Sequence, residues 1–199
     1  EPAERVVSHY YYVKRRPSHY LHHYIAKGMG LRDFASSGLS GELDNGQVRL
    51  LAGHDQDIPC GQCSPDLLRT AQDNIERHFS VVGVTERFDE SLALMCLTLG
   101  WPWTPYYLNQ NVTKDKPVAK EIAPETLKAI ECANPLDFQL YAWALRRFED
   151  EITQRTGQIG SILARIERAN HLYRPWGEFA DAFKRRLKPY LSQMRSATG

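Results

Sequence analysis

The sequence has no long apolar run, no excess of charge of one sign and no internal repeat. Its longest apolar stretches, 80–84 and 92–99, fall far short of the roughly 18 residues that a membrane span needs, so we expect no span within this chain. With 25 Lys and Arg against 24 Asp and Glu, the formal net charge is +1. This balance argues against a uniformly basic surface of the kind that binds bulk nucleic acid.

Methionine is absent before position 29, so we expect that the chain begins inside a longer product or after a processed segment. What is present is the composition of a folded domain, because 42% of the 199 residues are hydrophobic and 25% are charged. At this length one domain, or one domain with a helical extension, can bury most of its apolar surface without disulfides.

Charge is unevenly distributed along the chain. Residues 1–35 carry a net charge of +3, residues 36–91 carry −6 and residues 92–199 carry +4. Four of the seven histidines also lie in the first block. The chain therefore opens on a basic, His- and Tyr-rich segment, which leaves room for a local anion site despite the small net charge.

Two amphipathic helices are predicted in the first 80 residues. Over 3–14, apolar side chains recur at helical spacing, and Pro17 ends the pattern. Residues 38–61 are rich in Gly, Asp, Asn and Ser and predict a loop that carries a short ordered segment near its middle. Ser64 then precedes a proline and an acidic residue, the signature of a helix start, and that helix should run to about His78.

A short β-branched run follows at 80–84. It lacks polar alternation, which is typical of a strand buried on both faces of a parallel sheet. Glu86 and Arg87 would lie at its carboxyl end, where α/β sheets bind ligands, so they either face a substrate or form structural ion pairs. A helix is predicted over 88–99. The order helix, strand, polar turn, helix predicts an α/β fold.

The rest of the chain is predicted to be almost entirely helical. Asn134, followed by Pro, Leu and Asp, is a strong helix start, and the apolar pattern behind it continues to about residue 152. Further amphipathic segments are predicted at 159–166 and 176–194. The last one lies on a tail, 168–199, with seven Lys or Arg and two Asp or Glu.

Cys60 and Cys63 form a Cys-x-x-Cys pair, which can bind a metal, carry redox chemistry or close a tight disulfide. A structural zinc site needs a second ligand pair at suitable spacing. The other two cysteines, Cys96 and Cys132, are single members of apolar helical stripes. We therefore expect no metal, and the role of the Cys60 and Cys63 pair stays open.

Histidines of the basic block have the chemistry of a general base near neutral pH, namely His9 and the pair His22 and His23. Adjacent positions on a helix point about 100° apart, so Ser8 and His9 do not face one ligand in the same way. We expect His9 to be solvated or packed against tyrosines, and we assign no catalytic residue.

Four strings in a fixed order resemble sulfotransferase motifs. Residues 1–12 (EPAERVVSHYYY) are similar to the segment of sulfotransferases that binds the 3′-phosphate of the sulfonate donor. Residues 82–92 and 108–114 resemble later blocks of the carbohydrate 2-O-sulfotransferase-like family, which includes heparan sulfate and uronyl 2-O-sulfotransferases. Residues 134–141 resemble the last common helix of that family. The resemblance runs from residue 1 to about residue 152.

This resemblance implies an α/β fold with a P-loop nucleotide-kinase-like parallel sheet flanked by helices, of which this chain would be a mostly helical part. It also implies the donor 3′-phosphoadenosine 5′-phosphosulfate (PAPS), with Ser8 matching the serine that binds its 3′-phosphate. Asn111, Thr113 and Lys114 fall where the family places a loop over the nucleotide, so we expect them to contact the donor too. An amide, a hydroxyl and a cation on one loop suit a phosphate.

The activity that the resemblance implies is transfer of a sulfuryl group to a hydroxyl, on a carbohydrate acceptor, without a metal or a nucleic-acid partner. The family's 5′-phosphosulfate loop and histidine base would both precede Glu1, so we expect the segment alone to be inactive. Two alternatives remain open: a non-catalytic helical binding or scaffold module of the same fold, and a kinase-like phosphonucleotide enzyme. The phosphate loop distinguishes them. A scaffold module would lack such a loop, and a kinase-like enzyme would have one of the Walker type.

We expect a sulfotransferase domain over 1–155 and a basic helical extension over 156–199. From the resemblance, the expected cellular compartment depends on the source organism. A bacterial protein would be cytoplasmic, and a eukaryotic one would lie in the Golgi lumen with a membrane anchor upstream of Glu1. The acceptor, the position sulfated and the oligomeric state are not indicated by the sequence.

Overall fold

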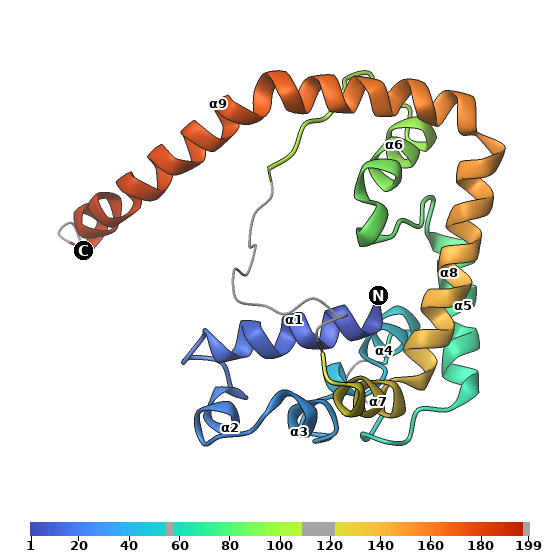
Figure 1. Ribbon diagram of the computed structural model, residues 1–199, viewed down its shortest axis with the longest axis vertical. Coiled ribbons are helices and arrows are strands. Elements are labelled where there is room, and N and C mark those ends of the chain that lie inside the picture. Colours follow the sequence, from blue (N-terminus) through green and yellow to red (C-terminus); the bar gives the residue numbers. More distant parts are fainter. Residues whose placement is uncertain (55–57, 109–121, 197–199) are drawn as a thin grey trace.

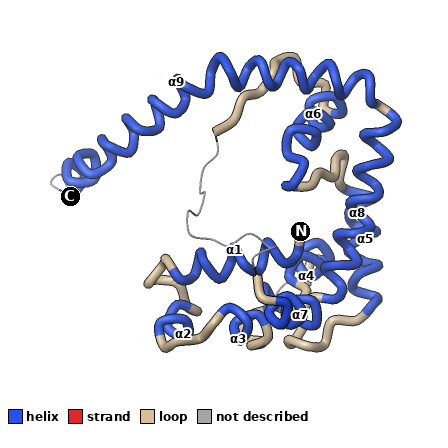
Figure 2. Tube along the Cα trace, in the orientation of Figure 1, coloured by secondary structure: helices blue, strands red, loops and turns tan. Residues whose placement is uncertain are grey.

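The computed structural model describes residues 1–54, 58–108 and 122–196, with side chains to residue 177 and at Phe179. Within these residues the chain is mostly helical and has no strand (Figure 2). The helices form an arc (Figure 1): α1 to α4 and α7 make one end, α5 and α8 the back, and α6 with the first part of α9 the other end. In chain order the elements are α1 (Pro2–Lys14), α2 (His22–Ala26), α3 (Leu31–Ala35), η1 (Gly41–Leu43), α4 (Gly46–Ala52), α5 (Pro65–His78), η2 (Thr85–Arg87), α6 (Phe88–Thr98), α7 (Pro124–Ala133), α8 (Pro135–Gln154) and α9 (Thr156–Ser196).

The helix α1 forms where the sequence predicts it. The Glu1 carboxylate accepts a hydrogen bond from the Glu4 N–H at 2.7 Å, and Pro2 occupies the first helical position. The apolar stripe of α1 is buried against α3 and α7, and the helix ends before Pro17. The helices predicted near 64–78, 88–99 and 134–152 are likewise confirmed as α5, α6 and α8.

The two amphipathic segments predicted at 159–166 and 176–194 are joined in one helix, α9, which continues through Pro175. A proline inside a helix removes one hydrogen bond, and it bends a helix without always ending it. The first part of α9 packs on α6 and α8, with Ile159 and Ile166 buried around Phe148. Beyond that part, Leu172, Tyr173, Trp176 and Phe179 of α9 are exposed. The expected division at residue 155 stays a prediction.

The strand predicted at 80–84 is wrong for the described part of the chain, which pairs this segment with no other strand. Val84 is extended, with φ −121° and ψ 138°, yet its hydrogen-bonding groups are taken by a side chain of α6. The Val84 N–H donates to Ser91 Oγ, and the Ser91 hydroxyl lies 2.9 Å from the Val84 carbonyl oxygen. Ser91 thus makes hydrogen bonds with Val84 that a neighbouring strand would otherwise make. The expected parallel sheet is not observed in the described residues.

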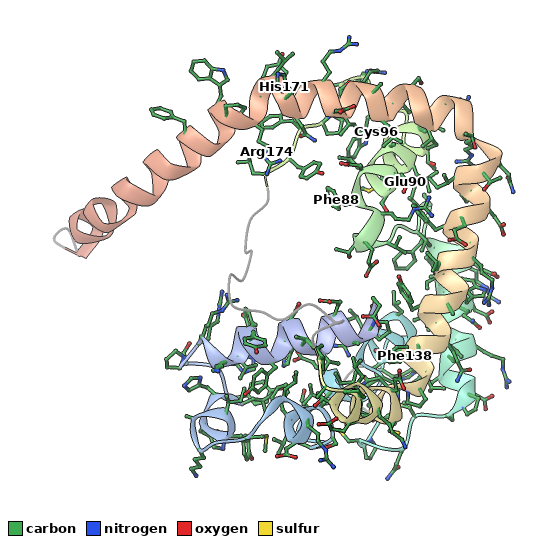
Figure 3. The ribbon with its side chains drawn as sticks, in the orientation of Figure 1. Phe88, Glu90, Cys96, Phe138, His171 and Arg174 are labelled. Atoms are coloured by element: carbon green, nitrogen blue, oxygen red, sulfur yellow. The ribbon has the colours of Figure 1, made fainter. Side chains whose placement is uncertain are left out.

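Three apolar clusters hold the arc together. The first joins α1, α3 and α7, the second joins α4, α5 and α8, and the third joins α6, α8 and α9. On the inner side of the arc, Phe88 lies at the start of α6 and Arg174 projects from α9 (Figure 3). None of the described helices has both the length and the apolar character needed to cross a bilayer.

Candidate functional site

Two helix starts far apart in the sequence cap each other. The Asp137 carboxylate, from the first turn of α8, accepts the N–H groups of Val48 at 2.8 Å and Gln47 at 3.1 Å, which begin α4. In return the Asn45 side-chain oxygen accepts the N–H groups of Leu136 at 2.8 Å and Asp137 at 3.3 Å. Because the first N–H groups of a helix lack partners within it, each residue satisfies donors of the other helix. This reciprocal cap fixes α4 against α8.

The helix α1 joins this cap through Arg5. The Arg5 guanidinium lies 3.4 Å from the Asp137 carboxylate and 3.4 Å from the Asn134 side-chain oxygen, which also accepts the Asn45 N–H. Burial raises the pKa of Asp137, while the backbone N–H groups and Arg5 oppose that rise. These donors therefore offset part of the cost of burying the Asp137 carboxylate.

A second buried ion pair holds the loop after α4. Arg49, only 1% exposed, binds the Asp44 carboxylate at 2.5 Å and the Asp44 carbonyl at 2.7 Å. Its guanidinium also donates to the carbonyl oxygens of Ile58 and Pro59. The Gly61 N–H donates to the same Asp44 carboxylate at 2.8 Å. The loop is therefore shaped by Asp44 and Arg49.

Cys60 and Cys63 lie on this loop as free thiols. Cys60 is exposed, whereas the Cys63 sulfur lies 3.8 Å from the Asp44 carboxylate. Burial, and then the Asp44 charge, raise the pKa of the Cys63 thiol, which disfavours the thiolate that redox or metal chemistry needs. Among the described residues no three His, Cys, Asp or Glu side chains gather as a metal site would require.

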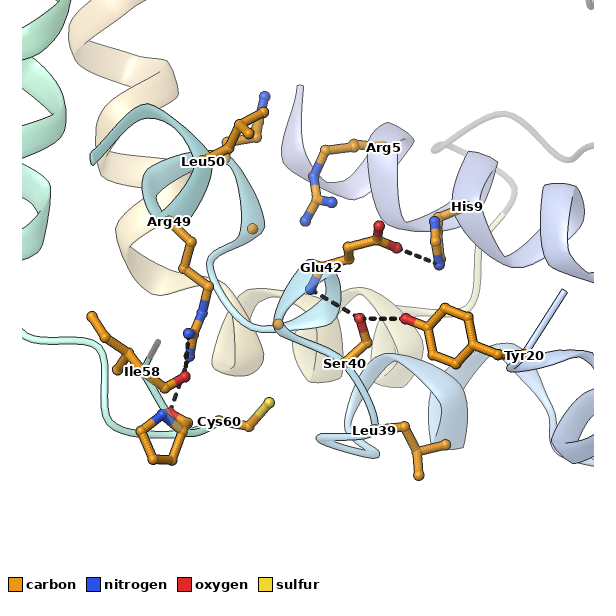
Figure 4. Close-up of a pocket in the computed structure, with 14 residues that line it drawn as sticks. Arg5, His9, Tyr20, Leu39, Ser40, Glu42, Arg49, Leu50, Ile58 and Cys60 are labelled. Carbon is orange, nitrogen blue, oxygen red and sulfur yellow. Dashed lines mark hydrogen bonds and ion pairs between the residues drawn. The ribbon is translucent and has the colours of Figure 1, made fainter. Parts of the chain in front are cut away.

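A cavity of about 890 Å³ opens between α1 and the segment from Leu39 to Cys60 (Figure 4). Its wall contains the two arginines just described together with His9, Glu42 and Gln47. The Tyr20 hydroxyl donates to Ser40 Oγ at 3.0 Å, and Ser40 Oγ also accepts the Glu42 N–H. The full lining is Arg5, His9, Tyr20, Leu39, Ser40, Gly41, Glu42, Gly46, Gln47, Arg49, Leu50, Ile58, Pro59 and Cys60.

His9 packs among aromatic rings, and one of them, Tyr12 at 6.5 Å between centroids, is a tyrosine as expected. The His9 ring stacks on Phe34 at 5.7 Å between centroids and meets His19 edge-on at 5.8 Å. Burial lowers the pKa of His9, the nearby Glu42 carboxylate opposes this effect, and His19 and Arg5 add to it. The neutral imidazole is thus favoured in the folded protein.

The other sequence-predicted residues are placed as follows. Ser8 is exposed on α1 and does not line the cavity. Asn111, Thr113 and Lys114 lie outside the described residues. Arg87 forms a bidentate pair with Glu90 at 2.5 and 2.6 Å and lies over the Phe148 ring. These contacts support the interpretation that Arg87 forms a structural ion pair.

Glu86, next to Arg87, pairs with the N-terminal ammonium group of Glu1 at 2.7 Å and also lines a smaller cavity of about 320 Å³. This cavity lies between the 81–86 segment and α8, where Tyr141 forms part of the wall. Both residues predicted at the end of the expected strand thus form ion pairs, and Glu86 in addition lines a cavity.

The sequence interpretation missed the reciprocal cap and the large cavity. Asn45 was understood only as part of a turn, and Asp137 only as an acidic residue at a helix start. The sequence did indicate that Asn45 and Asp137 are residue types that commonly cap helix N-termini. Because the two lie 92 positions apart, nothing local indicates that each caps the other's helix.

A family model described as galactose-3-O-sulfotransferase matches residues 48–172, from α4 into α9. The matched region includes Asp137 and residues 109–121, and it begins after α1, so Ser8 lies outside it. No curated protein and no solved structure matches the chain. The expected relationship to carbohydrate sulfotransferases is confirmed, although the matching model is the galactose-3-O type and the motifs were compared with the 2-O type. The chain belongs to the galactose-3-O-sulfotransferase family.

Proposed function

We propose that this protein uses PAPS to sulfate a hydroxyl of a galactose-type carbohydrate. The family match over 48–172 carries the proposal. In the reaction the acceptor oxygen attacks the sulfur of PAPS, and the bond between that sulfur and the phosphate oxygen breaks. 3′-Phosphoadenosine 5′-phosphate (PAP) leaves, and the hydroxyl proton passes to a base. We assign that base to no residue that the structure describes, because His9 faces Glu42 and aromatic rings.

We place the donor's 3′-phosphate on the exposed face of α1 at Ser8. The helix is 13 residues long, and Ser8 lies in its second turn with an exposed side chain. The free N–H groups of a helix lie in its first turn, so at Ser8 the donor available to a phosphate is the side-chain hydroxyl. The basic character of residues 1–35 also attracts a phosphate. Asn111, Thr113 and Lys114 are proposed as further donor contacts.

Calorimetric titration with PAP tests the donor site. Ser8→Ala should weaken PAP binding about 5- to 150-fold, corresponding to about 1–3 kcal/mol, because a charged phosphate loses one donor. Ser161→Ala, an exposed serine on α9, is the matched control and should bind as the parent does. Unchanged affinity of the Ser8→Ala variant removes Ser8 from the site, and absence of PAP binding in the parent contradicts the donor assignment.

Incubation of the intact protein, with any residues that precede Glu1, with sulfur-35-labelled PAPS and a β-galactoside tests the transfer itself. Labelled sugar, separated by chromatography, is the expected product. A protein that binds PAP and transfers no label to any sugar supports the non-catalytic alternative, whereas transfer of phosphate from ATP to the same sugar supports the kinase-like one.

A further inference from the structure

The distal part of α9 carries an exposed apolar stripe formed by Leu172, Trp176 and Phe179. Their side chains are 55%, 74% and 70% exposed. At 100° per residue, the three positions lie within about 60° of one another around the helix axis. Large apolar side chains that gather on one side of a surface helix mark a contact with another surface.

The described part of the molecule contacts α9 on a different side. The segment 106–108 packs on Gly177, where an added Cβ would lie 3.0 Å from Leu108 and 3.1 Å from Tyr106. Trp176 is the preceding position, so it points about 100° away from that contact. Beyond Gly177 the helix extends away from the other helices (Figure 1). Packing within the described residues therefore leaves the apolar stripe exposed.

The spacing of the apolar stripe continues in the sequence of α9. Intervals of four, three and four residues lead from 172 to 183, and the same intervals lead from 183 through 187 and 190 to 194. The sequence has Phe, Leu, Tyr and Met at these last four positions. An 11-residue repeat corresponds to about 3.67 residues per turn, so apolar positions that follow it stay on one line along a helix. Helix α9 runs to Ser196, so this line is about 37 Å long at 1.5 Å per residue.

Basic residues border the stripe by helical register. Arg168, whose side chain is exposed, and position 186, also an arginine, lie about 20° beyond Phe179. A lysine at position 184 and an arginine at position 195 lie on the other side, about 80–100° from Trp176. The two acidic positions of this tail, 178 and 181, fall more than about 120° from Trp176. The charge next to the stripe is therefore positive.

This pattern fits the surface of an anionic membrane. A helix with Trp, Phe and Leu on one face and Lys or Arg beside them binds in the plane of the bilayer interface. The cationic groups of its long side chains reach the lipid headgroups while the apolar rings enter the acyl boundary. Two copies that paired along the stripe would bring the bordering cations together, and this repulsion disfavours a second copy as the occupant.

We propose that the apolar stripe of α9 binds the surface of a membrane that contains anionic lipids, with Trp176 and Phe179 inserted at the interface. Both residues lie beyond the region 48–172 that matches the sulfotransferase family. The proposal therefore adds a membrane contact to the protein and does not depend on the proposed sulfuryl transfer.

Co-sedimentation of the full chain with lipid vesicles tests the membrane contact. Vesicles of phosphatidylcholine with about 30% phosphatidylserine should bind the parent at least about 10-fold more tightly than vesicles of phosphatidylcholine alone. Trp176→Ala should weaken binding to the anionic vesicles about 10-fold, because a large apolar side chain no longer enters the interface. Trp103→Ala removes a tryptophan that is 65% exposed outside α9, so it is the matched control and should bind as the parent does.

A second pair of variants tests the bordering charge. Arg168→Gln should weaken binding to the anionic vesicles about 3- to 5-fold, because one cation fewer faces the anionic lipids. Arg69→Gln, which replaces an exposed arginine of α5, is the control and should bind as the parent does. The replaced side chains are exposed, so circular dichroism should show that all four variants are folded.

Absence of parent binding to the anionic vesicles overturns the proposal, as does equal binding to both kinds of vesicle. An affinity that Trp176→Ala leaves unchanged, or that Trp103→Ala lowers as much, also overturns it. In analytical ultracentrifugation, a parent dimer that Trp176→Ala dissociates would show that a second copy covers the stripe, contrary to the proposal. PAP binding should be the same in the parent and in Trp176→Ala, so a failure of the membrane contact is distinguishable from a failure of the donor site.

Discussion

Removal of the Asp137 carboxylate should destabilise the protein strongly. In the Asp137→Ala variant the N–H groups of Val48 and Gln47 lose their acceptor, and Arg5 loses its nearest counter-charge. Each buried N–H left without a partner costs about 1–3 kcal/mol, and breaking a buried ion pair by removing one partner costs about 3–5 kcal/mol. These costs overlap because they concern one carboxylate. We therefore expect the free energy of unfolding to fall by about 3–5 kcal/mol.

Urea unfolding followed by the helical circular dichroism signal measures this loss. For a domain with a total stability of about 5–15 kcal/mol, the transition midpoint should move to much lower urea. Asp73→Ala, which removes an exposed partner of Arg77 on α5, is the matched control and should shift stability by less than about 0.5 kcal/mol. A loss below about 1 kcal/mol in Asp137→Ala, with an unchanged urea slope, would refute the reciprocal cap as a source of stability.

Three further results are expected. Gly83→Ala should lower the free energy of unfolding by about 1–3 kcal/mol in the same assay, because its Cβ would lie 2.7 Å from Ser91 Cβ; a stable variant would contradict this packing. Burial holds the pKa of His9 below its ordinary value of 6.5, so the unfolded chain binds the proton more tightly and stability should fall as the pH drops below about 6.5. His9→Gln should flatten that part of the stability profile, and an unchanged slope would count against the prediction. Iodoacetamide should modify the exposed Cys60 before Cys63, whose pKa is raised, as peptide mass mapping would show; the opposite order would contradict the placement of Cys63.

The longer helices were predictable because their signals are local, whereas α2 (His22–Ala26) and α3 (Leu31–Ala35) were not predicted. Pro2 and Pro65 stand at first helical positions, and the apolar residues behind them recur at helical spacing, so sequence alone locates α1 and α5. The apolar pattern located the segments 159–166 and 176–194 without showing that they form one helix, and a proline within a long helix does not always end it. Local patterns thus predict where helices start better than they predict where a helix continues.

The strand and the cavity depend on partners that lie elsewhere in the chain. The β-branched run at 80–84 fits an extended segment, but whether it joins a sheet depends on what pairs with it, and here the Ser91 hydroxyl meets Val84. The cavity needs α1, the Tyr20 region and the loop before Cys60 to meet in space. No spacing within any one of these segments indicates that meeting.

The reciprocal cap and the large cavity share residues, so the shape of the cavity depends on the cap. Asp137 accepts the N–H of Gln47 and faces the Arg5 guanidinium, so it positions two residues of the cavity wall. Ser8, in contrast, lies on the exposed face of α1 and outside the cavity. Loss of the Asp137 carboxylate should therefore weaken the fold and disturb the cavity wall, whereas loss of the Ser8 hydroxyl should weaken PAP binding and leave the fold intact.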